Sequence, residues 1–98
     1  MTLVTIVTRD VADRFRGFLT SVMLEVAPCT YVSPRMSKGV RERVWSVISE
    51  WHKAEPHGSI VMIWRERDAT GEVGLAQLGS PVKTLVEMDG MWIARAGS

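Results

Sequence analysis

LVTIVT-RDVADRFRG-FLTSVMLEV, residues 3–26, is the stretch that decides the fold of this chain. Its first part, residues 3–8, is an apolar run rich in β-branched residues, which is typical of a buried strand. A helical pattern follows, with apolar residues at positions 11, 15, 18, 19, 22, 23 and 26. Four charged residues stand near the joint: Arg9, Asp10, Arg14 and Arg16. An ordinary strand-to-helix turn does not need them, so we expect any chemistry of this chain here.

The predicted first helix begins at Asp10 and ends before Pro28. The Asp10 carboxylate can accept hydrogen bonds from free amides of the first turn, and Asp13 gives a pattern that resembles a capping box. Arg14 and Arg16 lie about 100° to either side of the apolar stripe, at opposite margins of the buried face. Cations in the first turns of a helix are mildly unfavourable. These arginines are therefore either solubilising rim residues or residues kept for binding, and both interpretations stay open at this point.

The rest of the sequence predicts one more helix and several short strands. The helix is expected to run from Ser33 or Ser37 to about Ala54, with a single apolar stripe. Strands are expected at residues 29–32, 59–65, 72–78, 82–86 and 91–94. Two helices with one apolar stripe each should cover one face of one sheet. We therefore expect a single α+β domain over residues 1–98.

The other face of that sheet is predicted to be apolar as well. In the strand at residues 59–65, one side carries Ile60, Met62 and Trp64, and the other carries Val61 and Ile63. A 98-residue monomer has no further element to cover the second side. A homodimer packed sheet to sheet would cover it.

Basic residues are concentrated in the first half of the chain. Residues 9–43 hold seven lysines and arginines against four acidic residues, an excess of three, although the whole chain has a net charge of +1. In the second helix, Lys38, Arg41 and Arg43 are expected to point away from the apolar stripe. This asymmetry indicates a polyanion as partner. No apolar run reaches the length of a membrane span and no signal segment is visible, so we expect a cytoplasmic protein without a membrane span.

The sequence contains none of the common catalytic or metal-binding motifs. Cys29 is the one cysteine and cannot form an internal disulfide. His52 and His57 have no ligand-like spacing and are expected at a helix end or on the surface. Asp10 stands at the end of the first strand, where a dimer could bring two copies together around a magnesium ion as a minimal phosphodiesterase site. The alternative for Asp10 is the helix cap described above.

Several short motifs give the chain a resemblance to a known family. In the first half they are Ile6-Val7-Thr8, Val11, Arg14-Phe15-Arg16-Gly17, Leu24-Glu25-Val26 and Tyr31-Val32. In the second half they are Val40-Arg41-Glu42, Val44-Trp45, Val61-Met62-Ile63-Trp64, Thr70-Gly71 and Asp89-Gly90. On these residues the chain resembles the CRISPR-associated protein Two (Cas-Two) family, in its type I-E branch, over nearly its whole length.

The resemblance implies a ferredoxin-like α+β fold, with two helices on one face of an antiparallel sheet, and a homodimer. It also implies a part in antiviral defence. In the type I-E branch the dimer bridges two dimers of the CRISPR integrase Cas-One and holds the double-stranded protospacer DNA during spacer acquisition. The role would be structural and DNA-binding, with the integration chemistry left to the integrase and no cofactor required.

The resemblance also assigns candidate residues. Arg14 and Arg16 match the family's basic pair that contacts the DNA backbone. Lys38 matches a family lysine when positions are counted forward from Tyr31-Val32. Counted back from Val40-Arg41-Glu42, it lies one residue away from that position. Lys83 matches one member of a later basic pair, whose other position is Val82 here.

An endonuclease is the alternative function that the resemblance raises. Family members ascribed metal-dependent nuclease activity use an acidic residue at the end of the first strand. Arg9 stands at the type I-E glutamate position of this chain, which leaves Asp10 as the candidate catalytic and magnesium-binding residue. A third hypothesis is a ferredoxin-like dimer that binds a protein partner only, with the basic half as a solvated surface.

Overall fold

The computed structural model describes residues 1–67, 70–79, 83–88 and 90–96, with the last two strands described by their backbone. The elements in chain order are β1 (Thr2–Arg9), α1 (Asp13–Val22), β2 (Leu24–Ala27), β3 (Thr30–Met36), α2 (Lys38–Ala54), β4 (Ser59–Arg65), a 3₁₀ turn (Thr70–Glu72), β5 (Val73–Leu78), β6 (Lys83–Met88) and β7 (Met91–Ala96). None of the described helices is both long and apolar enough to cross a membrane.

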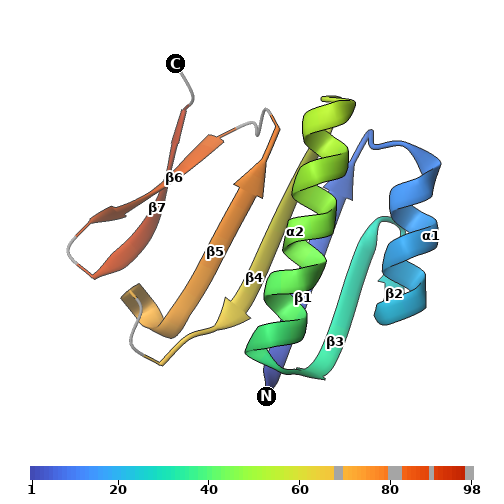
Figure 1. Ribbon diagram of the computed structural model, residues 1–98. Helices are drawn as coiled ribbons and strands as arrows, with labels where there is room; N and C mark the ends of the chain where they lie inside the picture. The colour runs from blue at the N-terminus through green and yellow to red at the C-terminus, as the bar shows by residue number, and fades with distance from the viewer. Residues whose placement is uncertain (68–69, 80–82, 89, 97–98) are drawn as a thin grey trace.

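Five strands form one antiparallel sheet in the order β2-β3-β1-β4-β5, and β6 and β7 pair as a separate hairpin. Both helices lie on the same side of this sheet, with α2 across its central strands and α1 beside β2 and β3 (Figure 1). The first six elements, β1-α1-β2-β3-α2-β4, have the connectivity of a ferredoxin-like fold. The predicted α+β class and the common face of the two helices are confirmed.

The core lies between the helices and the central strands. Val4 and Ile6 of β1 and Ile60 and Met62 of β4 point to the helices, because alternate residues of a strand share a face. The helices contribute buried side chains from their single stripes: Phe15, Leu19, Val44 and Ile48. The Phe15 and Phe18 rings of α1 meet the Trp51 ring of α2 edge-on at 5.5 and 5.4 Å between centroids. These contacts hold α1 against the end of α2.

The opposite face of the sheet is apolar and open. Leu3 and Val7 of β1 are 52% and 40% exposed, and Ile63 of β4 is 37% exposed. On the edge strand β2, Leu24 and Val26 are more than half exposed and continue this surface. We call these five side chains the open apolar face. The expectation that the fourth strand is apolar on both sides is therefore met, and a monomer leaves the second side in water.

The first helix is shorter than predicted at both ends. It begins at Asp13 after Ala12, which has no side-chain capping bond, so the prediction that Asp10 caps the helix is wrong. Asp10 instead has a φ of +56° and makes the turn that leaves β1, a conformation that aspartate tolerates better than most residues. At the other end, residues 24–27 pair with β3 as a strand, because pairing with a neighbouring strand outweighs a helical spacing of apolar residues.

The third strand and the second helix divide at Ser37. The Ser37 hydroxyl accepts a hydrogen bond from the Val40 amide at 3.2 Å, so the predicted start at Ser33 is wrong and the alternative start at Ser37 is confirmed. The strand continues to Met36 through Pro34, which lies beyond the last residue pair with β2 and therefore needs no amide donor on that side.

Arg41 does not point away from the apolar stripe as predicted. Its residue is 7% exposed, with the guanidinium 4.3 Å from the Trp64 ring centroid and Nη1 3.9 Å from Glu66 Oε2. Trp64 also donates to Glu66 at 2.8 Å, so the three side chains form one cluster between α2 and β4. Arg41 is part of the packing and is not available to a polyanion.

Candidate nucleic-acid interface

Arg14 joins the first turn of α1 to the last turn of α2. Its Nη2 donates to the Trp51 carbonyl at 3.3 Å and lies 3.5 Å from Glu55 Oε2, and its guanidinium is 4.9 Å from the Trp51 ring centroid. A cation near the carboxyl end of a helix is favourable, because the last carbonyls carry partial negative charge. The side chain is 45% exposed. Arg14 therefore has a structural role, and part of its surface remains open to solvent.

Arg16 lies on the other flank of α1, beside β2. Its Nε and Nη2 both lie 3.1 Å from Oε1 of Glu25, and its side chain is 70% exposed. The Glu25 side chain is only 19% exposed, and its second oxygen accepts from the Cys29 amide at 3.2 Å. Burial and the negative charges of Glu25 and Cys29 raise the pKa of the neighbouring Tyr31. Arg16 thus presents a largely exposed guanidinium that is held at its base by a fixed carboxylate.

Lys38 is not brought together with the two arginines. It is the first residue of α2, whereas Arg14 contacts the last turn of the same helix. Sixteen residue steps at 1.5 Å place these ends about 24 Å apart along the axis. That separation spans about seven phosphates along one strand of a DNA duplex, so one chain would reach distant phosphates. Lys83 begins β6, and its side chain lies outside the described residues.

The excess of basic residues expected between residues 9 and 43 is only partly available at the surface. Three of the seven cations are paired with glutamates in the structure, and one of these, Arg41, is buried. The other four are exposed and have no ion pair with a described residue: Arg9, Arg35, Lys38 and Arg43.

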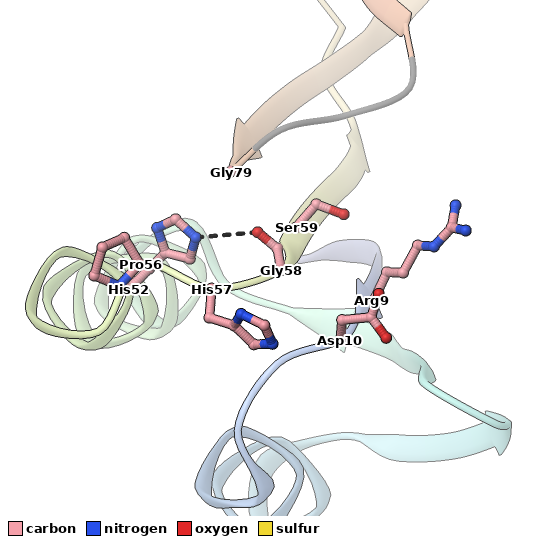
Figure 2. Close-up of a pocket in the computed structure, with 8 residues that line it drawn as sticks. All are labelled: Arg9, Asp10, His52, Pro56, His57, Gly58, Ser59 and Gly79. Atoms are coloured by element: carbon pink, nitrogen blue, oxygen red, sulfur yellow. Dashed lines mark hydrogen bonds between the residues drawn. The ribbon is translucent and has the colours of Figure 1, made fainter.

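Asp10 lies at an open hollow of about 430 Å³ where β1 ends and β4 begins. His52 and His57 reach the same hollow from the end of α2 and the loop that follows, while the Arg9 side chain extends away from them (Figure 2). His52 Nε2 lies 3.2 Å from the Gly58 carbonyl oxygen, which fixes its ring. Spacing along the sequence gave no sign that these histidines would meet Asp10, because the fold joins them through the β1–β4 pairing.

Two glycines make the close approach of strands at this hollow possible. Gly58 and Gly79 have φ values of +78° and +90°. A Cβ atom at Gly58 would collide with the carbonyl oxygens of Arg9 and Asp10, and one at Gly79 would collide with the Gly58 carbonyl. Proline and glycine near both positions, Pro56 with Gly58 and Gly79 with Pro81, are sequence signals for a break in the chain, although not for the contact between the two glycines.

The described residues around Asp10 do not form a metal centre within one chain. Among the described residues there is no group of three or more histidine, cysteine, aspartate or glutamate side chains placed to hold a metal ion. Asp10 itself is exposed. A magnesium ion at this position would therefore need ligands from outside the described part of one chain.

The sequence matches a known protein family over most of its length. The model of the family described as CRISPR-associated protein (Cas_Cas2CT1978) matches residues 3–93, which is nearly the whole chain. The match covers both helices and the five strands of the main sheet, apart from Thr2 at the start of β1. The chain therefore belongs to this CRISPR-associated family, the Cas-Two family of type I-E systems.

Proposed function

We propose that this protein is a cytoplasmic DNA-binding scaffold of the spacer-acquisition complex, which bridges integrase Cas-One dimers and holds the protospacer duplex. Its family is linked to spacer acquisition. The observation that carries the DNA-binding part is Arg16, whose side chain is 70% exposed and whose guanidinium is paired on one side with Glu25. Arginine suits a phosphate because its planar fork can donate two parallel hydrogen bonds.

The scaffold would be a homodimer that buries the open apolar face. Exposed aliphatic side chains such as Leu3, Val7 and Ile63 lie on adjacent strands of a single surface, and a second copy brings a surface of the same kind. Contiguous apolar surface of this type marks an interface in a soluble protein. A two-fold axis between the two packed sheets would leave both helix layers outside, so that α1 and the start of α2 of each copy face solvent and DNA.

Binding of a DNA duplex by the Arg16→Ala variant tests this function. The measurement is affinity for a labelled duplex with the integrase present, over a range of salt concentrations. Losing one phosphate contact should lower the slope of log affinity against log salt by about 0.9 per contact. Arg65→Ala is the matched control, because Arg65 is also an exposed arginine, 3.2 Å from Glu72, at the far end of β4. Equal affinity and slope for Arg16→Ala and the unaltered protein would refute the proposal.

A pull-down separates this function from binding of a protein partner alone. The scaffold should retain the integrase more strongly when the duplex is present. Retention that is independent of DNA, together with no duplex binding by the mixture, would favour a dimer that binds protein only.

A metal-dependent endonuclease is the second candidate, and one observation favours it. Since Asp10 does not cap α1, its exposed carboxylate beside the hollow has no structural role among the described contacts. In a dimer, a second Asp10 would be needed to hold magnesium. Cleavage of RNA or DNA with magnesium by the protein, and its loss in Asp10→Asn, would support this activity. Equal cleavage by both would indicate a contaminating nuclease.

A further inference from the structure

We infer that Glu25 is a positioning residue for DNA binding: it fixes Arg16 so that the outer edge of the guanidinium is ready for a backbone phosphate. This inference rests on the proposed function, because it assumes that Arg16 contacts DNA. It assigns to an acidic residue a favourable part in binding a polyanion. Simple counting of charge predicts the opposite.

The contact with Glu25 uses only part of the hydrogen-bonding capacity of Arg16. A guanidinium has five N–H donors, arranged along a side edge and an end edge. The side edge of Arg16, Nε with Nη2, is directed at a single oxygen of Glu25. The other three N–H donors have no partner among the described residues, and the side chain is 70% exposed. The free donors include one N–H on each of the two terminal nitrogens, Nη1 and Nη2. Together these two N–H groups can donate parallel hydrogen bonds to one phosphate.

Glu25 is itself held in place. Its Oε2 accepts from the amide of Cys29, a turn residue with a φ of +61° between β2 and β3. The side chain is 19% exposed, against 70% for its partner. The carboxylate is therefore a fixed anchor for the more exposed arginine. An exposed arginine without such an anchor would lose conformational freedom when it binds DNA.

The Glu25 charge has two opposing effects on DNA binding. Ordering one long side chain on binding lowers affinity by a factor of roughly 2 to 10, and an anchored side chain avoids much of this loss. The carboxylate also repels the phosphate, but its charge is already compensated by Arg16, and water and salt screen what remains at the surface. We therefore expect the ordering effect to be the larger of the two.

A double-mutant cycle on Arg16 and Glu25 tests the inference, with affinity for a labelled DNA duplex measured in the presence of the integrase. Glu25→Ala should bind about 2 to 10 times more weakly than the unaltered protein, although the variant is more positive by one charge. In the Arg16→Ala background, the same Glu25→Ala change should not weaken binding further. Glu25→Gln, whose amide oxygen can still accept from Arg16, should recover part of the lost affinity. Glu50→Ala, which removes an exposed acidic residue of α2, is the matched control for the change in charge.

The outcomes of this cycle distinguish failure of the inference about Glu25 from failure of the proposed function at Arg16. Equal or tighter binding by Glu25→Ala would overturn the inference and show that charge alone decides. An equal loss in both backgrounds would also overturn it, because Glu25 would then act through the β2–β3 turn and not through Arg16. If Arg16→Ala itself changes neither affinity nor salt dependence, the proposed function at Arg16 fails, and that result is visible in the same cycle.

Discussion

Replacing Arg14 and replacing Arg16 by alanine are predicted to affect the stability of the fold very differently. Arg14 stacks on the Trp51 ring, donates to the Trp51 carbonyl and lies beside Glu55, so it ties α1 to the end of α2. Arg16 makes one ion pair at the surface, with Glu25. The family match includes both positions, yet only Arg14 is part of the packing between helices.

The size of the Arg14 effect follows from its contacts. A cation over a tryptophan ring contributes about 0.5–1 kcal/mol at an exposed site, and the hydrogen bond to a helix-end carbonyl about 0.5 kcal/mol. The pair with Glu55 adds about 0.3 kcal/mol at most, since both side chains are more than a third exposed. Arg14→Ala should therefore lower the free energy of unfolding by about 1–2 kcal/mol, and Arg16→Ala by less than about 0.5 kcal/mol.

Thermal unfolding followed by circular dichroism measures this difference. For a domain of this size, a loss of 1 kcal/mol lowers Tm by about 4–8 °C, so Arg14→Ala should unfold about 5–15 °C earlier than the unaltered protein. Arg16→Ala should stay within about 4 °C of it. Protein concentration must be equal throughout, because a dimer makes Tm concentration-dependent. Arg14→Lys keeps the charge at the helix end but loses the planar stack on Trp51, so its Tm should lie between those of Arg14→Ala and the unaltered protein.

Two results would refute this reasoning. One is a Tm for Arg14→Ala within about 2 °C of the unaltered protein, which would mean that the stack and the hydrogen bond contribute nothing. The other is an equally large decrease in Tm for Arg16→Ala, which would mean that the exposed Arg16–Glu25 ion pair stabilises the fold as much as the Arg14 contacts do. The result also decides how DNA binding is interpreted. If Arg14→Ala loosens the helix layer, only Arg16→Ala reports on a phosphate contact by itself.

Three further predictions concern the open face, the turn glycines and the tyrosine. Ile63→Lys should leave the helical circular dichroism signal unchanged while sedimentation shows a shift from dimer to monomer; an unchanged dimer would place the interface elsewhere. Gly58→Ala should lower Tm by several degrees because of its positive φ and the strand that it would meet, whereas Gly39→Ala, in open helical space, should raise Tm slightly. The pKa of Tyr31, the one tyrosine, is raised, so its absorbance should titrate above pH 10. The stability that this shift contributes should be present below pH 10 and lost as pH rises through the folded-state pKa. Glu25→Gln should lower the titration midpoint, and an unchanged midpoint would show that the Glu25 charge does not act on Tyr31.

The central architecture was predictable because the sequence patterns there are long and regular. Residues 3–8 and 59–65 are strands, and α2 keeps the stripe of Val44, Ile48 and Trp51 against the sheet. Helical and strand periodicities of this length report directly which side chains are buried. The family match then confirmed the resemblance carried by these same segments.

What the sequence could not predict were the contacts that depend on chain segments meeting in space. Arg41 was expected on the surface because it is charged, yet its long stem packs between α2 and β4 with the charged end over Trp64. Asp10 was expected to cap a helix because the residue type is right, but the chain turns there with positive φ and the helix begins at Asp13. In both cases the residue type is compatible with two positions: surface or packed for Arg41, and helix cap or turn for Asp10. Only the tertiary structure decides between them.

The missed strand β2 had the largest consequence for the candidate site. If the helix had continued to Val26 as predicted, Arg16 and Glu25 would be nine residues apart on one helix. Nine steps of about 100° place two side chains on opposite sides of the axis, about 13.5 Å apart along it, so they could not touch. The break at Met23 and the return of residues 24–27 along β3 bring the carboxylate to 3.1 Å from the guanidinium. The short edge strand therefore does more than extend the sheet, because it also supplies the anchor that turns an exposed arginine into an oriented one.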